Sequence, residues 1–271
     1  MTAAVEARTP TPAAATRTPG FVDVLRAEWV KMVSVRSTWW TVATTFLIGA
    51  GLTILMCWGN ADWLASPEAD ESPGSFITFG TMFTPILAVI FGALLVTTEY
   101  GTRMIHATFA AVPARGKVLT AKALLAGAVM FVVGLVTALV AYAGGNIFFE
   151  REGIGIALEG DMLRAVVGGG LALAGMAVFT VAVGFLLRHT AGTISLVLAL
   201  IMILGNLVNI VPGELGEWLT KLMPGNAVMP VANVVSFNPN LLEPWTGFAV
   251  FLAECAAVVA VAWVMLRRRD A

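Results

Sequence analysis

Residues 99–122 read EYGTRMIHATFAAVPARGKVLTAK and form a short polar stretch between two long apolar runs, 76–96 and 123–143. This polar stretch carries four basic residues and one acid, which are Arg103, Arg115, Lys117, Lys122 and Glu99. Apolar runs of about 20 residues are long enough to cross a bilayer as helices. The two flanking runs therefore indicate a membrane protein that exposes residues 99–122 at one membrane surface.

The composition predicts more than two such helices. Of the 271 residues, 58% are hydrophobic and only 12% are charged, and the mean hydropathy is +0.87. A soluble domain carries roughly 25% charged residues. The runs that are long enough to span a bilayer are 39–58, 76–96, 123–143, 165–187, 191–211 and 245–266. Because backbone groups in lipid must be satisfied within the segment, we predict an all-α polytopic membrane protein with six transmembrane helices.

Within the polar stretch, apolar residues recur at helical spacing. Ile105 and Phe109 fall on one face, whereas Arg103 and His106 fall on another. Pro113 ends the pattern, because a helix rarely continues through the residue before a proline. We predict a short helix at the membrane surface that is rigid enough to transmit a movement. The alternative is that the loop only fixes the topology through its positive charge.

Basic residues are distributed unevenly between the two sides of the membrane. If the N-terminus is cytoplasmic, only Arg151, Arg164 and Lys221 of the 16 basic residues lie outside. The acids that remain inside are Glu6, Asp23, Glu28, Glu99 and Asp270. Short cytoplasmic loops are enriched in Lys and Arg. We therefore predict a multi-pass protein of the cell membrane with both termini in the cytoplasm.

The N-terminal region combines a polar tail with an amphipathic segment. Residues 1–20 contain several prolines and no apolar core, so we predict a disordered cytoplasmic tail instead of a signal peptide. Residues 21–37 repeat apolar side chains at helical spacing, which predicts a helix in the membrane interface. Its candidate contact residues are Glu28, Trp29, Lys31 and Arg36. The helix is either an anchor alone or also a contact for a cytoplasmic partner, and residues 21–271 form the transmembrane domain.

The segment between the fifth and sixth runs is too apolar for a free loop and too broken for a span. Residues 214–223 have a helical pattern, and Pro224 and Pro230 interrupt the chain after residue 223. We predict one or two outer helices that are partly re-entrant and folded against the bundle.

Few polar residues interrupt the six runs, and each is a candidate for helix packing or for a pathway. Pro85 should kink the second run, and either Thr81 or Thr84 is placed to compensate for the lost hydrogen bond. Asn206 and Asn209 are three residues apart and share one face of the fifth run. Glu254 is the one charge well inside a run, where an ionised acid costs roughly 2.5–3.5 kcal/mol. Glu254 either packs as a hydrogen-bonded acid or carries a proton.

No motif for enzymatic chemistry is present in the sequence. The closest string to a phosphate-binding loop, AAVPARGKV at 110–118, lacks the first glycine and the final hydroxyl residue. His106 and His189 are isolated from other metal ligands, and Cys57 and Cys255 lie at different depths. We therefore predict no enzyme activity, no metal, no cofactor and no disulfide in this chain. The short basic loops also argue against nucleic acid as a partner.

Several short motifs together resemble the membrane subunit, or permease, of ABC-2 type ABC exporters. The motifs are LRAEWVK at 25–31 with SVRS at 34–37, TEY at 98–100 with TFAAVP at 108–113, RHTAG at 188–192, and RRRDA at 267–271. The similarity extends from residue 21 to the C-terminus.

The resemblance implies a transporter built from two permease copies, expected as a homodimer, and two cytoplasmic ABC ATPase subunits that bind ATP and Mg. The segment after the second span is then the coupling helix, which docks in a groove of the ATPase. The helix before the first span is the connecting helix beside it, and the segment after the fifth span supplies external helices. Residues expected at the coupling contact are Glu99, Arg103, Ile105, His106, Phe109, Pro113 and Arg115.

The family analogy also suggests the class of cargo, which is a hydrophobic drug, an antibiotic or a lipid. The alternative function is a secondary transporter in which Glu254 carries a proton. Such transporters are typically built from internal repeats and hold several ionisable groups in their spans. The sequence shows one such group and no convincing repeat.

Overall fold

The computed structural model describes residues 19–235, 238 and 240–268 of the chain. Most of the predicted tail, residues 1–18, lies outside the described residues. The described part is built of helices and contains no strand. Six of its helices are long and apolar enough to cross a membrane. The prediction of an all-α polytopic membrane protein is confirmed.

The six candidate spans follow the order of the predicted apolar runs. The first span, Arg36–Leu64, joins α2 (Arg36–Phe46), the π-helical turn η1 (Leu47–Gly51) and α3 (Leu52–Leu64). The next three spans are α5 (Thr84–Gly101), α7 (Arg115–Arg151) and α8 (Gly160–Leu187). The fifth span, Thr190–Leu207, joins α9 (Thr190–Leu198), the π-helical turn η3 (Ala199–Leu204) and α10 (Gly205–Leu207). The sixth span is α13 (Pro244–Arg268).

Shorter helices precede and connect these spans. They are α1 (Phe21–Ser34), α4 (Pro73–Ile77), η2 (Phe79–Met82), α6 (Met104–Ala111), η4 (Val208–Ile210), α11 (Glu214–Lys221) and α12 (Pro224–Ala232). Val35 is extended and separates α1 from α2. Arg36, which the sequence assigned to the interfacial helix, therefore begins the first span.

α8 lies at the centre of the bundle, where it packs against α5, α7, α12 and α13. In its most apolar stretch 72% of the residues are buried, compared with 17% in the fifth span. Glycines allow this close packing. A Cβ atom on Gly134 of α7 would lie 2.9 Å from the carbonyl oxygen of Gly169 on α8. Small residues at such crossings let helix backbones approach each other in a membrane.

The second span differs from the single kinked helix that the sequence predicted. α4 and η2 precede α5, and Pro85 stands in the first turn of α5. A proline is favoured there because its missing N–H would have no helical partner. The amide of Gly80 donates to Oγ1 of Thr53 at 2.9 Å, and Oγ1 of Thr81 donates to Oδ1 of Asn233 at 2.7 Å. The broken backbone is thus satisfied by protein groups instead of facing lipid.

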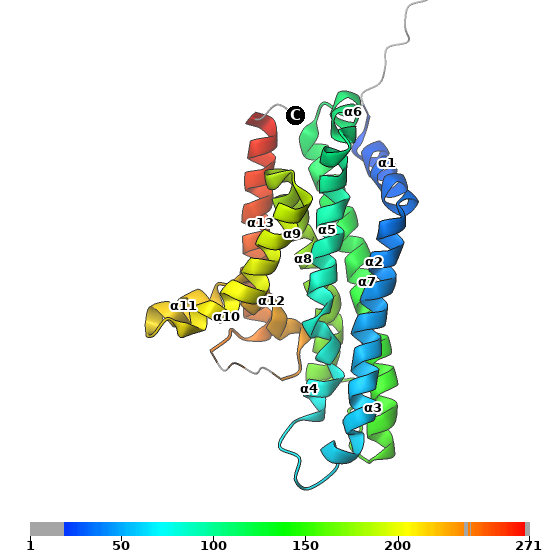
Figure 1. Ribbon diagram of the computed structural model, residues 1–271, viewed down its shortest axis with the longest axis vertical. Coiled ribbons are helices and arrows are strands. Elements are labelled where there is room, and N and C mark those ends of the chain that lie inside the picture. The colour runs from blue at the N-terminus through cyan, green and yellow to red at the C-terminus, as the bar shows by residue number, and fades with distance from the viewer. Residues whose placement is uncertain (1–18, 236–237, 239, 269–271) are drawn as a thin grey trace, which may run out of the picture.

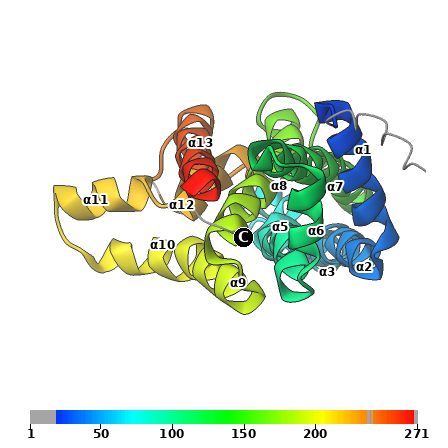
Figure 2. The ribbon, with the colours of Figure 1, turned by 90° about the horizontal axis from the view of Figure 1, so that it is seen from above.

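The expected outer helices are α11 and α12. α11 points sideways from the bundle in Figure 1, and Figure 2 shows it on the side opposite α1. The chain is interrupted before Pro224, which opens α12, whereas Pro230 lies inside α12, and α12 packs against α8 and α13. Arg164 of α8 donates to the carbonyl oxygens of Pro230, Val231 and Asn233 at 2.7, 3.3 and 3.1 Å. These bonds satisfy the C-terminal end of α12 and hold it on the bundle.

Charged residues divide between the two ends of the bundle. α1, α6 and the last turns of α13 lie at one end, at the top of Figure 1, and α4 lies at the other. The first end, which we call the basic end, holds Arg26, Lys31, Arg36, Arg103, Arg115, Lys117, Lys122, Arg188, Arg267 and Arg268. The opposite end, which we call the acidic end, holds Asp62, Glu68, Asp70, Glu71, Glu150, Glu152, Glu159 and Asp161.

α7 is longer than a membrane crossing requires. Its 37 residues extend for about 55 Å, whereas the hydrocarbon core of a bilayer is about 30 Å thick. The link between α7 and α8 is hydrogen-bonded to the last turns of α7. The hydroxyl of Tyr142 donates to the carbonyl of Ile156 at 2.7 Å, and Oδ1 of Asn146 accepts from the amide of Ile156 at 2.8 Å. The link between α7 and α8 is therefore held against the acidic end of α7.

We expect Gly168→Ala to destabilise the protein and Gly169→Ala to leave its stability nearly unchanged. A Cβ atom on Gly168 would fall on the carbonyl oxygen of Val231 in α12, and such overpacking costs about 1–3 kcal/mol. A Cβ atom on Gly169 would lie 3.4 Å from Cβ of Ala138, which is ordinary contact. The measurement is thermal unfolding in detergent, followed by tryptophan fluorescence. Equal midpoints for the two variants would contradict the packing of α12 on α8.

Candidate functional site

α6 at the basic end has one buried face and one exposed face. Arg103 adopts the left-handed conformation, with φ of 60°, where the chain reverses between α5 and α6. Ile105 and Phe109 are only 1% and 7% exposed and belong to the main hydrophobic core. Arg103 and His106 are exposed. The apolar face of the helix therefore packs onto the bundle, and its polar face is open to solvent.

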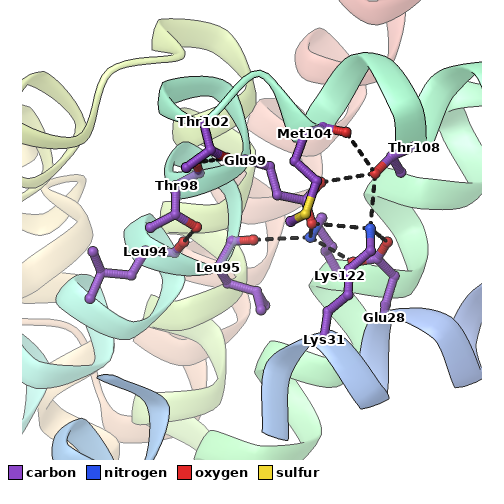
Figure 3. A network of polar contacts seen from close by, with 10 residues as sticks. All are labelled: Glu28, Lys31, Leu94, Leu95, Thr98, Glu99, Thr102, Met104, Thr108 and Lys122. Carbon is purple, nitrogen blue, oxygen red and sulfur yellow. Dashed lines mark hydrogen bonds and ion pairs between the residues drawn. The ribbon is translucent and has the colours of Figure 1, made fainter. Parts of the chain in front are cut away.

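Beneath α6, four charged side chains from three helices meet (Figure 3). α1 supplies Glu28 and Lys31, α5 supplies Glu99, and α7 supplies Lys122. Nζ of Lys122 lies 2.6 Å from Oε2 of Glu28 and 2.7 Å from Oε1 of Glu99. Nζ of Lys31 lies 2.7 Å from Oε1 of Glu28 and 3.2 Å from Oε1 of Glu99. We call these four residues the ion-pair network, and their formal charges cancel.

Thr108 connects α6 to the ion-pair network. Nζ of Lys31 donates to Oγ1 of Thr108 at 2.9 Å, and Oγ1 of Thr108 donates to Oε2 of Glu99 at 3.2 Å. The hydroxyl of Thr108 thus links α6 to Lys31 of α1 and to Glu99 of α5. Glu99 is in turn paired with Lys122 of α7.

Three of the four side chains in the ion-pair network are almost fully withdrawn from water, whereas the side chain of Lys31 is 29% exposed at the rim. Lys122 is 1% exposed, and Glu28 and Glu99 are each 2% exposed. Lys122 also donates to the carbonyl oxygen of Leu95 at 3.0 Å. Buried charges are tolerated when they are paired and hydrogen-bonded, as these are. Their net contribution to stability is small, but removing one partner costs about 3–5 kcal/mol because a charge is left unpaired. The network therefore fixes the relative positions of α1, α5 and α7.

Lys31, at the rim of the network, stays protonated. Burial by itself lowers the pKa of Lys31, but the carboxylates of Glu28 and Glu99 outweigh burial and hold this pKa above its usual value. A raised lysine pKa contributes stability below the unfolded-state pKa, and this stability disappears only as the pH rises through the folded-state pKa. The ion pairs of Lys31 therefore persist through neutral and moderately alkaline pH.

A second link at the basic end, between α8 and α9, is also held by polar contacts. Arg188 adopts the left-handed conformation and places its guanidinium 5.3 Å from the ring centre of Tyr100. The hydroxyls of Thr97 and Thr190 lie 2.7 Å apart. Nδ1 of His189 accepts from the amide of Gly192 at 3.0 Å and so caps α9. His189 thus has a local structural role.

A family model described as ABC-2 family transporter protein matches residues 24–206. The match begins in α1, includes all four residues of the ion-pair network and ends in α10. The chain belongs to the ABC-2 family. It is therefore a membrane permease of an ABC transporter, in a family whose members associate with an ABC ATPase subunit. No curated protein is similar enough to be matched with the chain.

The residues expected at the coupling contact of this ABC-2 permease do not share one surface. Arg103, His106 and Pro113 are exposed, whereas Glu99, Ile105 and Phe109 are buried. Arg115 begins α7, and its guanidinium lies 5.2 Å from the ring centre of Phe109. The buried residues therefore pack α6 against the bundle. Only the exposed residues are accessible to a partner protein.

The residues expected on the interfacial helix also divide by environment. Trp29 is exposed on α1, and Arg36 is exposed at the start of α2. Glu28 and Lys31 point into the ion-pair network instead. Only part of the predicted contact set on α1 therefore faces outward.

The polar residues predicted within the spans lie in three separate places. Thr84 is buried beside a cavity of about 30 Å³, which Thr53 and Thr137 also line. Asn206 lines a wider cavity, and its Nδ2 donates to the carbonyl of Met202 at 2.7 Å. The side chain of Asn209 lies outside what the structure describes.

Glu254 is half-buried on α13. One of its carboxyl oxygens is buried and has no hydrogen-bond partner among the described residues. Glu254 lines neither of these two cavities. The structure therefore does not join it to Thr84 or Asn206 in one polar site.

Sequence reasoning missed the pairing of Lys122 with Glu28 and the role of Thr108. A usable signal was nevertheless present. Glu28, Lys31, Glu99 and Lys122 lie on helices that flank or enter apolar runs, where an unpaired charge is costly. Their equal numbers of acids and bases could have suggested that they meet. Within the network, Lys31 and Glu99 are 68 positions apart and Lys122 and Glu99 are 23 apart, so no local pattern encodes these pairs.

We expect Lys122→Met to lower the free energy of unfolding by about 3–5 kcal/mol, because two buried carboxylates would share only Lys31. The measurement is thermal unfolding of the purified protein in detergent. The matched control is Lys221→Met, which breaks a pair with Glu217 at 3.9 Å between partly exposed side chains. Such a pair contributes about 0–1 kcal/mol.

Combining Lys122→Met with Glu99→Gln should recover part of the lost stability. The double variant removes one charge of each sign and leaves Glu28 paired with Lys31. If Lys122→Met alone unfolds at the same temperature as the unaltered protein, the buried pairing is wrong.

Proposed function

We propose that the protein is the permease subunit of an ATP-driven exporter in the cell membrane, and that its ATPase partner docks on the exposed face of α6. The basic end would face the cytoplasm, because short cytoplasmic loops are enriched in Lys and Arg. Both termini would then be cytoplasmic. α6 would be the coupling helix and α1 the connecting helix.

The observation that carries the proposal is the position of α6 between solvent and the ion-pair network. Arg103 and His106 are open to a partner, while Thr108 on the same helix bonds to Lys31 and Glu99. A displacement of α6 by the ATPase would act on α1, α5 and α7 together, because separating buried partners is costly. Rigid-body movement of packed helices is a common way to transmit such a change.

The wide cavity beside Asn206 supports a hydrophobic cargo. Its volume is about 520 Å³, and it opens between the start of α5, the η3 turn and α12. Apolar side chains make up much of its lining, including Phe79, Met82, Ile86, Leu198, Ile201 and Met229. Mostly apolar pockets with a few polar groups suit small hydrophobic ligands. A drug-like molecule, an antibiotic or a lipid therefore fits the proposal.

A second permease copy would complete the transporter, together with two ATPase subunits. The fifth span, η4 and α11 expose several large apolar side chains, which are Leu196, Met202, Ile203, Leu204, Leu207, Ile210, Leu215 and Trp218. Large exposed apolar patches mark contacts with protein or lipid. A homodimer in which this face meets its copy would enclose the cavity beside Asn206.

Proton-coupled transport through Glu254 is the second candidate function. It is favoured by the carboxyl oxygen of Glu254 that lacks a hydrogen-bond partner among the described residues. It is disfavoured by the separation of Glu254 from the wide cavity, because a proton carrier should lie near the cargo.

We expect the double variant Arg103→Glu/His106→Glu to reduce the amount of ATPase that copurifies with the permease by roughly tenfold or more, equivalent to a loss of at least about 1.4 kcal/mol of binding. Both side chains are exposed, so the fold should remain intact. The measurement is affinity purification from native membranes in mild detergent. The ATPase is identified by peptides that contain a Gly-x-x-x-x-Gly-Lys-[Ser/Thr] loop.

The matched control is Arg151→Glu/Lys221→Glu, which changes two basic residues away from the basic end. It should retain the ATPase fully. Phe109→Asp would be an unsuitable test, because Phe109 is buried and its loss would disturb the fold. Absence of any ATPase from the purified material, or full retention by the Arg103→Glu/His106→Glu variant, would refute docking on α6.

We expect Glu254→Gln to change ATP hydrolysis by the reconstituted complex less than about twofold, because the amide has nearly the same shape and no step of ATP-driven export needs a proton at this position. The measurement is ATP hydrolysis in proteoliposomes that contain a pH-sensitive dye. Proton movement by the permease without ATP, abolished by Glu254→Gln, would instead favour proton-coupled transport.

A further inference from the structure

A groove of about 640 Å³ opens at the basic end, beside the link that follows α6, and Arg103 and His106 do not line it. It lies between the first residue of α1, the link from α6 to α7, and the last turns of α13. Its principal lining residues are Phe21, Pro113, Arg115, Lys117, Trp263 and Arg267. The charged residues that line it are all basic, within the part of the chain that the structure describes. The groove therefore favours an anionic occupant.

Two of these basic side chains are placed to bind an anion. Nζ of Lys117 contacts the carbonyl of Pro19 at 3.3 Å and keeps donors for another acceptor. The guanidinium of Arg267 lies 3.6 Å from the ring centre of Trp263. Stacking on a ring fixes a guanidinium while leaving the N–H groups at its edge available for an oxyanion. Lys117 of α7 and Arg267 of α13 thus both supply positive charge to the groove.

Further features of the groove add to its attraction for a phosphate. α7 starts here, so the positive end of its helix dipole faces the groove, although the amides of Arg115 and Lys117 already donate to the carbonyls of Pro113 and Ala114. The indole nitrogen of Trp263 lies against the start of α7, where a Cβ atom on Gly116 would meet it. Arg115 is already engaged, since it donates to the carbonyl of Leu266 at 3.4 Å. Arg115 therefore helps to form the floor of the groove.

The groove lies where a lipid headgroup would be found. Tryptophan is enriched at the membrane interface, and Trp263 stands near the end of the last span. Phe21 and Val22, at the start of the predicted interfacial helix, are exposed at the same end. Basic pockets between spans on the cytoplasmic side attract the headgroups of anionic lipids.

We propose that this groove binds the phosphate of an anionic phospholipid, such as phosphatidylglycerol, from the cytoplasmic leaflet. The inference rests on the proposed orientation, in which the basic end faces the cytoplasm. The bound headgroup would bridge Lys117 of α7 and Arg267 of α13. It would thereby join two spans beside the link that leaves the coupling helix.

The test uses the purified full-length protein in a non-ionic detergent, titrated with phosphatidylglycerol or with phosphatidylcholine of the same acyl chains. Native mass spectrometry counts bound lipids, and thermal unfolding reports stabilisation. We expect phosphatidylglycerol to be retained preferentially. Lys117→Gln/Arg267→Gln should bind it roughly thirtyfold more weakly. Each basic residue near a membrane surface contributes about 1 kcal/mol of attraction to anionic lipid, and the loss of two such residues corresponds to this factor. The control, Arg151→Gln/Lys221→Gln, removes two charges elsewhere and should bind it normally.

Three results would overturn the proposal. The first is equal retention of the two lipids, and the second is unchanged binding by the Lys117→Gln/Arg267→Gln variant. The third is equal protection by inorganic phosphate at millimolar concentration, which would make the groove a site for a free anion. Copurification of the ATPase separates this test from that of the proposed function. Lys117→Gln/Arg267→Gln should keep the ATPase, and its loss without a loss of lipid binding would assign the groove to the ATPase.

Discussion

Two carboxylates and one ammonium group are buried at the basic end of this permease, a second ammonium group lies at their rim, and each carboxylate contacts both lysines. Glu28 and Lys31 come from a helix at the membrane surface, Glu99 ends one span, and Lys122 lies within the first two turns of another. An isolated charge in this position would cost several kcal/mol. The positions of α1, α5 and α7 are therefore interdependent, and α6 joins them through Thr108.

Hydropathy alone was sufficient to predict the six spans, because lipid imposes one solution on a long apolar run. It was insufficient for the interior of the second span. Pro85 in an apolar run is compatible both with a kink and with the first turn of a new helix. The break is supported by Thr53, which accepts from the amide of Gly80 27 residues away, and by Asn233, which accepts from the hydroxyl of Thr81 152 residues away. The residues next to Pro85 in the sequence do not indicate that Thr53 and Asn233 are the hydrogen-bond partners.

The candidate site shows a similar limit. Helical periodicity correctly separated Ile105 and Phe109 from Arg103 and His106, because a helix has two faces whatever it packs against. Periodicity does not specify what each face meets, and at a membrane surface an apolar face can pack on lipid, on a partner or on its own bundle. Here it packs on the bundle. The buried pairing of Glu28 with Lys122 depends on helix positions that only the folded structure supplies.

The length of α7 has a mechanical consequence. Lys122 stands near one end of a continuous helix that runs on to Arg151. The distance between these two residues is about 44 Å at 1.5 Å per residue. A tilt of about 5° around the buried lysine would swing the far end through about 4 Å, more than the width of a water molecule. Tyr142 and Asn146 fasten the loop after α7 to that far end, so the loop would travel with it. A sub-ångström displacement beside the lysine would thus become a displacement of molecular size at the far end of α7.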